Sequence, residues 1–347
     1  MSNRQGFEEL FQNVVSMERC TGCGACFVAC PFEHVLDYLD GPKLVGECKR
    51  CGICLRTCPR SNFDAAELDE FFFGRKRTSE EPFGIHLSLQ VTRALDPQVM
   101  SAGQDGGVAT ALLLNALDSE LIDGAIVSST DTSQPWLPVP SIARSHEEIL
   151  AAAGTRYSYS PGLLALKKVA DEQLKKVVFV GPPCQVIALR RMQRANLKKM
   201  VGPVDLVIGL FCSESFSYER LMLEKIQKGM GINLNDVEKM NIKGRMQLTL
   251  KGGKIVEIPL KEARSYAEPY CRFCGDFSAE FADISLGGVG LDGQTFTVTR
   301  TEHGKRFLDA AVESGALEVR PVDEFKKALD LMVRLSISKR SRAQGTT

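Results

Sequence analysis

The chain has 347 residues, of which 44% are hydrophobic, and this is enough material for two or three globular domains. Its 43 basic residues balance 43 acidic ones, which argues against a nucleic-acid-binding protein that depends on overall positive charge. No apolar run approaches the roughly 20 residues that cross a bilayer, and the first residues contain no apolar signal segment. We therefore expect a globular, cytoplasmic protein with no nucleic-acid partner and no transmembrane segment of its own. Such a protein can still dock on the cytoplasmic face of a membrane complex.

Residues 1–19 carry hydrophobic side chains at helical spacing and predict a short helix that packs on the module after it. That module contains eight of the twelve cysteines, in one pattern that occurs twice. The two copies are Cys20, Cys23, Cys26 and Cys30 before Pro31, and Cys48, Cys51, Cys54 and Cys58 before Pro59. This spacing is typical of a bacterial-type ferredoxin with two 4Fe-4S clusters.

Three thiolates two residues apart can hold three corners of one cluster, while the cysteine before the proline is turned toward the other cluster. We therefore predict one cluster on Cys20, Cys23, Cys26 and Cys58, and a second on Cys48, Cys51, Cys54 and Cys30. Disulfides would require an oxidising compartment, which nothing in the sequence indicates. Zinc is the remaining alternative, but zinc sites use pairs of cysteines and do not explain repeated triplets followed by Cys-Pro.

The rest of the chain predicts an α/β (α+β mixed) domain over residues 84–320. Residues 63–83 form a linker, whose aromatic run at 71–73 either packs on the next domain or docks a partner. Strands are predicted near 87–94, 124–129, 176–181 and 204–212, with a hairpin at Gly252 and Gly253. Ser145 and Ser160 are predicted helix N-caps. Residues 321–347 are expected to form a helix over 323–335 and a solvated basic tail.

Four cysteines lie outside the repeated pattern. Cys184 follows one predicted strand and opens a helix, and Cys212 ends the next strand. If these strands are parallel neighbours, both sulfurs lie at one edge of the sheet, where Cys271 and Cys274 could complete a set of four thiolates. The spacing leaves four possibilities open: a third 4Fe-4S cluster, a redox-active CxxC pair, a zinc site, or unrelated buried thiols.

Two segments could hold a phosphate. Residues 104–110 place paired glycines before a helix, which exposes N–H groups at the positive end of the helix dipole, although such glycines are more often a simple turn. Residues 154–161 combine a cation, hydroxyl groups and aromatic rings, with a capped helix start as the alternative. The four histidines are scattered and show no arrangement for nucleophilic catalysis.

As a set, these motifs resemble the family of coenzyme F420 hydrogenase/dehydrogenase β-subunits, over nearly all the chain beyond the cysteine-rich module. The segments that carry the resemblance are 104–110, 154–161, 181–185, 210–212, 271–277 and 282–285. Within that family, a fused module with two clusters looks like the component that feeds electrons into archaeal F420H2 dehydrogenase complexes.

The resemblance implies FAD, coenzyme F420 as substrate, and a third 4Fe-4S cluster on Cys184, Cys212, Cys271 and Cys274. It implies a cofactor site at Gln104, Asp105, Gly106, Gly107, Val108, Thr110, Arg156, Tyr157, Ser160 and Pro161. A hydride would pass from reduced F420 to FAD, and single electrons would pass through the clusters to a membrane-bound complex that reduces a quinone or methanophenazine. No catalytic side chain is expected, because the cofactors carry the chemistry. Candidate cations for the anionic F420 tail are Arg156, Arg190, Arg191, Lys243 and Arg245.

Three other functions remain open from the sequence. The chain could be a soluble oxidoreductase that exchanges electrons between ferredoxin and F420. It could be the F420-reducing β subunit of a hydrogenase or formate dehydrogenase. A flavin-free iron–sulfur electron relay is the alternative that is not an enzyme.

Overall fold

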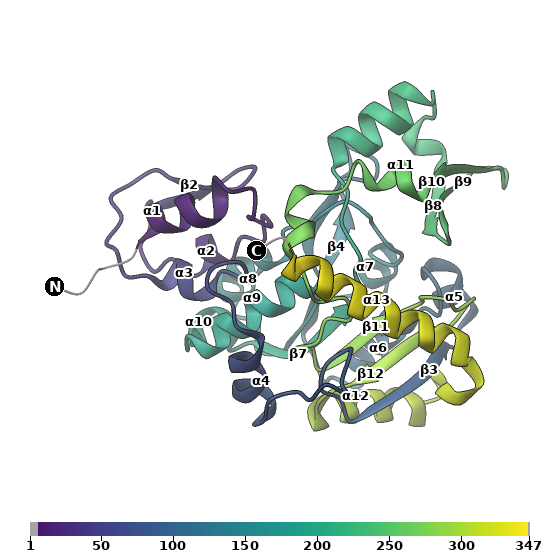
Figure 1. The fold of residues 1–347 in the computed structure, drawn as a ribbon. Helices are drawn as coiled ribbons and strands as arrows, with labels where there is room; N and C mark the ends of the chain where they lie inside the picture. The colour runs from purple at the N-terminus through teal and green to yellow at the C-terminus, as the bar shows by residue number, and fades with distance from the viewer. Residues whose placement is uncertain (1–5, 346–347) are drawn as a thin grey trace.

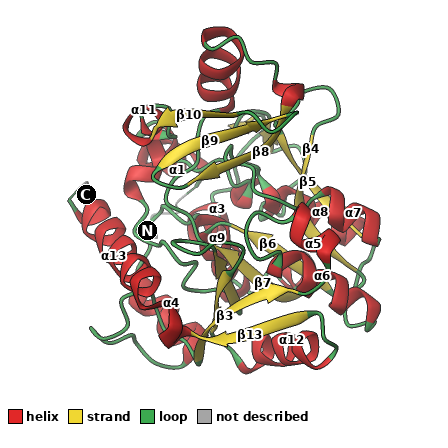
Figure 2. Cartoon of the chain, turned by 90° about the vertical axis from the view of Figure 1, so that its right-hand side faces the viewer, coloured by secondary structure: helices red, strands yellow, loops and turns green. Residues whose placement is uncertain are grey.

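The computed structural model describes residues 6–345 and is built around a sheet of eight strands (Figure 2). Its order is β13-β3-β12-β11-β7-β6-β4-β5. The strands are β3 (Ser88–Ala94), β4 (Gly124–Thr130), β5 (Pro138–Ala143), β6 (Val177–Gly181), β7 (Val204–Leu210), β11 (Ile284–Gly287), β12 (Thr295–Thr299) and β13 (Leu317–Pro321). The four central strands β4, β6, β7 and β11 are parallel, and antiparallel strands flank them on both sides. The predicted α/β class is confirmed.

Helices cover both faces of this sheet, as the nearly continuous hydrophobic runs of its central strands require. One core contains Phe179 and Val207 and lies under α8 (Ala165–Asp171), α9 (Pro183–Arg194) and α10 (Lys198–Val201). The other core contains Val178 and Leu206, the neighbours of those two residues along each strand. The opposite face carries α5 (Pro97–Ala102), α6 (Val108–Asp118), α7 (His146–Ala151) and α12 (Glu302–Glu313).

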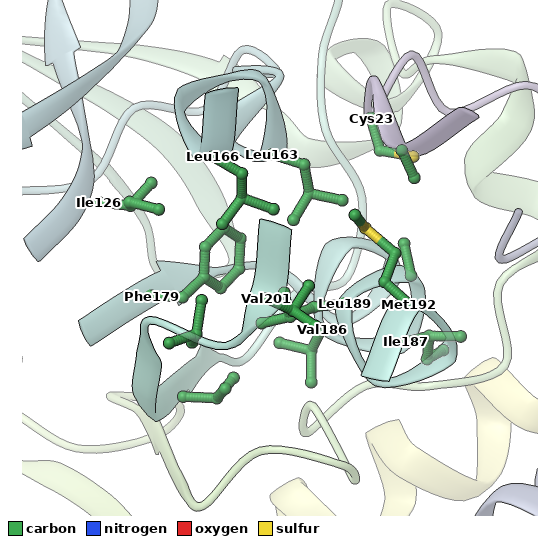
Figure 3. Packing of buried hydrophobic residues seen from close by; sticks show 14 of the residues in the cluster. Cys23, Ile126, Leu163, Leu166, Phe179, Val186, Ile187, Leu189, Met192 and Val201 are labelled. Atoms are coloured by element: carbon green, nitrogen blue, oxygen red, sulfur yellow. The ribbon is translucent and has the colours of Figure 1, made fainter. Parts of the chain in front are cut away.

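The N-terminal module is docked on the first of these two cores. It consists of α1 (Phe7–Leu10), η1 (Phe11–Val15), α2 (Ala25–Val28), β1 (Leu36–Tyr38), β2 (Pro42–Leu44) and α3 (Ile53–Thr57). The predicted N-terminal helix packs on this module through Phe7 and Leu10, whereas residues 1–5 lie outside the described chain. Cys23 belongs to the core that also contains Leu163 and Met192, as Figure 3 shows. The module and the α/β domain therefore share buried surface.

The segment expected to be a linker contains helix α4 (Ala65–Phe73). Its N-cap is Asp64, whose side chain accepts a hydrogen bond from the Ala66 N–H group. Phe73 stacks on Phe281 with ring centroids 6.4 Å apart. Arg190 lies over the ring of Phe72 at 3.9 Å, whereas Phe71 is 48% exposed. Two of the three aromatic side chains thus pack on the next domain, which was the simpler of the two interpretations.

A second, smaller sheet has its own core. Strands β8 (Val237–Ile242), β9 (Arg245–Leu250) and β10 (Ile255–Pro259) pack with η3 (Tyr218–Gly229) and α11 (Leu260–Arg264). The short element η4 (Leu234–Asp236) completes this region, which projects from the main sheet in Figure 1, whereas η5 (Pro269–Phe273) packs against the C-terminal helix. The predicted hairpin is confirmed, because β9 and β10 are antiparallel and Gly252 and Gly253 have φ of 83° and 81°.

Two local predictions are wrong. The C-terminal helix α13 (Lys326–Gln344) follows η6 (Val322–Phe325) and continues through the basic segment that was expected to be a solvated tail (Figure 1). The reason is that Ser336 and Lys339 are buried against the body of the protein. Ser160 is not an N-cap, because the short helix η2 (Gly162–Leu164) begins after Pro161. The Ser145 cap is confirmed, with its side chain accepting a hydrogen bond from the Glu148 N–H group.

Candidate metal centres and cofactor site

The eight cysteines of the N-terminal module line two separate cavities. We call Cys20, Cys23, Cys26 and Cys58 the first thiol group, and they line one cavity together. We call Cys30, Cys48, Cys51 and Cys54 the second thiol group, and they line the other. The structure thus brings together the same sets of four that the spacing predicted, each with one cysteine from the opposite copy of the pattern. Within residues 6–345, no group of three or more His, Cys, Asp or Glu is close enough to hold a single metal ion.

Glycines in the left-handed conformation shape both cavities. Gly24 (φ 80°) precedes α2 and Gly52 (φ 73°) precedes α3, so that each loop turns sharply between its second and third cysteine. Backbone N–H groups also point at the sulfurs: Phe7 N lies 3.5 Å from Sγ of Cys48, and Arg60 N lies 3.4 Å from Sγ of Cys58. Such hydrogen bonds to sulfur are among the features that set the potential of an iron–sulfur cluster.

Without a metal, these thiols are held in an unfavourable environment for ionisation. Burial, followed by the neighbouring thiolates, raises the pKa of Cys23 to about 12. Burial likewise raises the pKa of Cys54 to about 12 and that of Cys58 to about 11. Iron would supply the missing positive charge and deprotonate a coordinating thiol outright. The donor set and its surroundings therefore fit iron–sulfur clusters.

The remaining four cysteines form a third thiol group: Cys184, Cys212, Cys271 and Cys274. Strands β6 and β7 are adjacent and parallel, and they deliver Cys184 and Cys212 to the same edge of the sheet. Burial raises the pKa of Cys184 to about 12, and the charges of Cys274 and Cys212 contribute. Burial and the charge of Cys212 also raise the pKa of Cys271, and Ser215 N lies 3.3 Å from its sulfur. The four thiols are thus close enough to act on one another electrostatically.

Cys274 differs from the other three because two cations lie beside it. Burial raises its pKa, but the positive charges of Lys339 and Arg60 outweigh burial and bring the pKa down to about 6. Lys339 is only 4% exposed, and its Nζ donates to the backbone carbonyl of Cys212 at 2.5 Å. Arg60 donates to the carbonyl of Phe273 at 3.3 Å.

Sequence reasoning missed both cations. Lys339 was assigned to a solvated tail, but Met332, Ser336 and Lys339 follow at helical spacing and extend the buried stripe of α13. That spacing was the available signal. Arg60 follows the Cys-Pro of the second copy directly, and nothing in the sequence indicates that it reaches another domain.

The third thiol group adjoins the first. The charges of Cys184 and Cys23 act on each other and both raise the pKa of Tyr159, after burial. The Tyr159 hydroxyl lies 3.8 Å from Sγ of Cys184. Cys51, in the second thiol group, is exposed. The three groups therefore lie in the order third, first, second from the sheet edge to the surface of the N-terminal module.

The predicted glycine loop is packed tightly on the main sheet. Gly107 (φ 66°) is the N-cap of α6, whose Val108 and Thr110 are buried. The N–H group of Gly106 donates to Oγ1 of Thr295 at 3.2 Å, and a β-carbon at Gly106 would lie 2.7 Å from that oxygen. The glycine is required here by contact with the sheet. Its N–H group is already paired within the protein.

Gln104 joins this loop to the other predicted segment. Its Nε2 donates to the carbonyl of Met240 in β8 at 2.9 Å, and its Oε1 accepts from the N–H group of Thr155 at 3.4 Å. Burial raises the pKa of the neighbouring Asp105, while the charges of Lys243 and Lys239 oppose this. The two segments predicted to bind a cofactor are therefore side by side, between the two sheets.

Arg156 and Tyr157 have partners within the protein. The guanidinium group of Arg156 donates to the carbonyls of Ala151 and Ala152 at 3.1 Å and 2.8 Å, so it caps the end of α7. Burial lowers its pKa. The Tyr157 ring packs edge-on against Phe216 at 6.3 Å.

Several buried polar atoms near these segments have no hydrogen-bond partner among the described residues. These atoms include the hydroxyl groups of Ser128, Ser158 and Ser160 and Oε1 of Gln185. Ser160 lies just before Pro161, which precedes η2. Ser128 lies in the last part of β4, and Gln185 follows β6, so both belong to the carboxyl edge of the sheet. Buried polar groups are rarely left unpaired. These atoms fit a site for a polar ligand such as FAD.

Most of the cations predicted to bind the anionic tail of F420 already have partners within the protein. Arg190 pairs with Asp283 at 2.9 Å in the interior, and Arg191 donates to backbone carbonyls of the N-terminal module. Neither guanidinium group is available to a substrate. Lys243 forms an ion pair with Asp292 at the surface, and Arg245 lies 3.6 Å from Glu257.

Comparison with known proteins adds three family matches. The sequence profile for the C terminus of the coenzyme F420 hydrogenase/dehydrogenase beta subunit matches residues 174–325, and the corresponding N-terminal profile matches residues 89–167. A 4Fe-4S dicluster domain profile matches residues 19–63. The last match confirms the predicted ferredoxin module.

Individual relatives agree with these matches. The chain is 36% identical to the beta subunit of the coenzyme F420 hydrogenase of Methanothermobacter thermautotrophicus, over 75% of this chain and 94% of the relative. It is 29% identical to the F subunit of the F420H2 dehydrogenase of Methanosarcina mazei, over 94% of this chain and 91% of the relative. A chain in the structure of the F420-reducing [NiFe] hydrogenase complex from Methanosarcina barkeri matches with a TM-score of 0.74 and 36% identity. That match covers 78% of this chain and 94% of the other.

Proposed function

The chain belongs to the family of coenzyme F420 hydrogenase/dehydrogenase beta subunits, which joins F420-dependent oxidoreduction to iron–sulfur electron transfer, and on this basis we propose that it oxidises reduced F420. The third, first and second thiol groups, in that order from the sheet edge, would hold 4Fe-4S clusters, which would take up the two electrons of each hydride one at a time. The acceptor is another subunit of a membrane-bound F420H2 dehydrogenase complex on the cytoplasmic side.

The observation that carries this proposal is the order of the three thiol groups. The third group lies beside the edge of the sheet where the two candidate cofactor segments meet, and Cys23 of the first group acts electrostatically on Cys184. The second group reaches the surface at the exposed Cys51. Clusters in this order would form one chain of electron carriers from the α/β domain to a partner at the surface of the N-terminal module.

A flavin fits the sheet edge chemically. FAD would accept both electrons of a hydride together and release them singly, which is the conversion that one-electron clusters require. The residues proposed to hold it are the unpaired Ser128, Ser158 and Ser160 hydroxyls and Gln185 Oε1, which can pair with its polar groups. Tyr157 supplies an aromatic ring, and the N–H groups at the start of α6 supply the positive end of a helix dipole.

The extent of the alignments favours a component of a dehydrogenase. The match to the F subunit of the F420H2 dehydrogenase spans 94% of this chain. The unmatched residues are fewer than those of the N-terminal module, so the match includes at least part of that module. The match to the beta subunit of the hydrogenase leaves a quarter of this chain unmatched. The sequence identity is higher for the hydrogenase relative, however, and so the second candidate is the F420-reducing β subunit of a hydrogenase complex.

Anaerobic titration of the cofactor-replete protein with reduced F420 tests the proposal, with NADH as the control donor. We expect reduced F420, and not NADH, to bleach the flavin absorbance and then the broad iron–sulfur absorbance. In Cys184→Ala, the flavin should still bleach while the clusters of the N-terminal module are reduced much more slowly. A protein that binds clusters but no flavin would instead be an electron relay. Co-purification with membrane subunits or with hydrogenase subunits separates the two candidates.

A further inference from the structure

The third thiol group is held between two cations that come from opposite ends of the chain. Arg60 belongs to the N-terminal module, and Lys339 belongs to the last helix. Both act on Cys274, and Lys339 also acts on Cys212 and Cys271. Lys339 lies beyond residue 325, where the match to the family profile ends. The matched profile therefore does not include this residue.

The burial of Lys339 is unusual for its residue type. Lysine is almost never fully buried unless it is paired, and here the side chain is only 4% exposed. Its Nζ donates to the carbonyl of Cys212, and the negative charges that act on it come from the thiol group and Asp276. The hydrogen bond of Lys339 and the charges that act on it thus converge on the third thiol group and on Asp276 beside it.

We propose that Lys339 and Arg60 raise the reduction potential of a 4Fe-4S cluster bound by Cys184, Cys212, Cys271 and Cys274. A cluster with four thiolates gains one negative charge when it takes up one electron. Nearby positive charge stabilises the reduced form more than the oxidised form, and charge and hydrogen bonding around the sulfurs are recognised determinants of cluster potential. Low solvent exposure strengthens the effect, because the charges are poorly screened.

The two cations also make the site depend on correct assembly of the chain. Arg60 reaches the third group only if the N-terminal module is docked, and Lys339 reaches it only if α13 is docked. The potential of the cluster nearest the proposed flavin site is thereby set by elements outside the α/β domain. A potential raised in this way favours arrival of each electron at the third group.

A redox titration followed by electron paramagnetic resonance on the full, cluster-replete chain tests this inference, which rests on the proposed third cluster. Lys339→Met keeps the length of the side chain and removes its charge. We expect the equilibrium constant for reduction of one cluster to become about ten-fold smaller. For a one-electron couple, this lowers the reduction potential of that cluster by about 59 mV. Arg60→Met should lower the same potential, and Lys339→Arg should retain it. Lys327→Met is the matched control, because Lys327 is exposed on the same helix.

Unchanged potentials in variants that keep the full iron content of the parent would overturn the inference. So would loss of the third cluster in both Lys339→Met and Lys339→Gln, since the lysine would then be needed only to build the site. A parent protein with iron for two clusters would refute the third cluster itself. That outcome is visible before any variant is made, and it is independent of whether F420 reduces the protein.

Discussion

The guanidinium group of Arg191 donates to the backbone carbonyl of Ser61 at 2.7 Å, across 130 residues of chain. The same group donates to the carbonyls of Arg56 at 2.7 Å and Leu55 at 3.3 Å. These carbonyls lie at and just beyond the end of α3, where helix carbonyls lack partners within the helix. One side chain of α9 thus caps a helix of the N-terminal module and fixes the module to the α/β domain.

Replacing Arg191 by alanine should loosen the module. Hydrogen bonds to a charged group contribute about 1.5–3 kcal/mol each, and their losses are not additive, so we expect the docked state to lose about 2 kcal/mol or more. Faster hydrogen exchange in α3 and new protease cleavage after α4 would report the change. Arg194→Ala is the control, because Arg194 makes an exposed ion pair with Glu67, and such pairs contribute about 0–1 kcal/mol. Equal rates of hydrogen exchange in α3 in the two variants would contradict the role of Arg191 in fixing the module to the α/β domain.

The crossed arrangement of the N-terminal cysteines predicts different iron losses in two double variants. Cys20→Ala with Cys58→Ala affects a single thiol group, so about four iron atoms should be lost. Cys20→Ala with Cys30→Ala affects both groups, so about eight iron atoms should be lost. Iron and sulfide analysis of the purified proteins distinguishes the two. If Cys20 with Cys30 cost only one cluster, each copy of the pattern would hold its own cluster instead.

Gly24 should not tolerate a side chain. Its φ of 80° costs a non-glycine residue about 1–2 kcal/mol, and a β-carbon there would lie 2.5 Å from Cδ2 of Leu164. Gly24→Ala should therefore be destabilised by about 1–3 kcal/mol beyond the backbone strain. Gly74→Ala is the control, because Gly74 has a similar φ of 71° and nothing lies within 4 Å of its added carbon. Thermal unfolding measures both, and equal losses would show that the Leu164 contact is unimportant.

His86 should make the protein less stable in mild acid. Burial lowers its pKa, and the charge of Arg300 lowers it further, although the hydrogen bond to the Gly84 carbonyl opposes this. The unfolded chain then binds the proton more readily than the folded one. The stabilisation is complete above the ordinary pKa of 6.5 and is lost as the pH falls through the lower value of the folded state.

Substitution of His86 by asparagine should therefore flatten the decline of the unfolding temperature between about pH 7.5 and about pH 5.5. His34→Asn is the matched control, since His34 is exposed and its φ of 56° suits asparagine. Parallel declines in the parent and His86→Asn would mean that another group causes the acid sensitivity.

Local patterns predicted the elements whose partners are close in sequence. The spacing of Cys20, Cys23 and Cys26 determines one loop, and Gly252 and Gly253 determine one hairpin. The sites of Lys339 and Arg156 were missed. Lys339 is buried because α13 packs across the body of the protein; its helical spacing with Met332 and Ser336 indicates a buried stripe, but the run of basic residues around it favoured a solvated tail. Arg156 looked like a free cation, yet the end of α7 provides carbonyls within a few residues of it.

The three thiol groups lie at different places along the chain, so their cysteines become complete at different times during synthesis. The first and second groups are complete once residue 58 has been made, and N-terminal domains fold early during synthesis. The third group waits for β6, β7 and η5, and its lysine arrives only with residue 339. Iron can thus be delivered to the N-terminal module while the ribosome is still translating. The third site cannot be loaded before its last cysteine, Cys274, has been made.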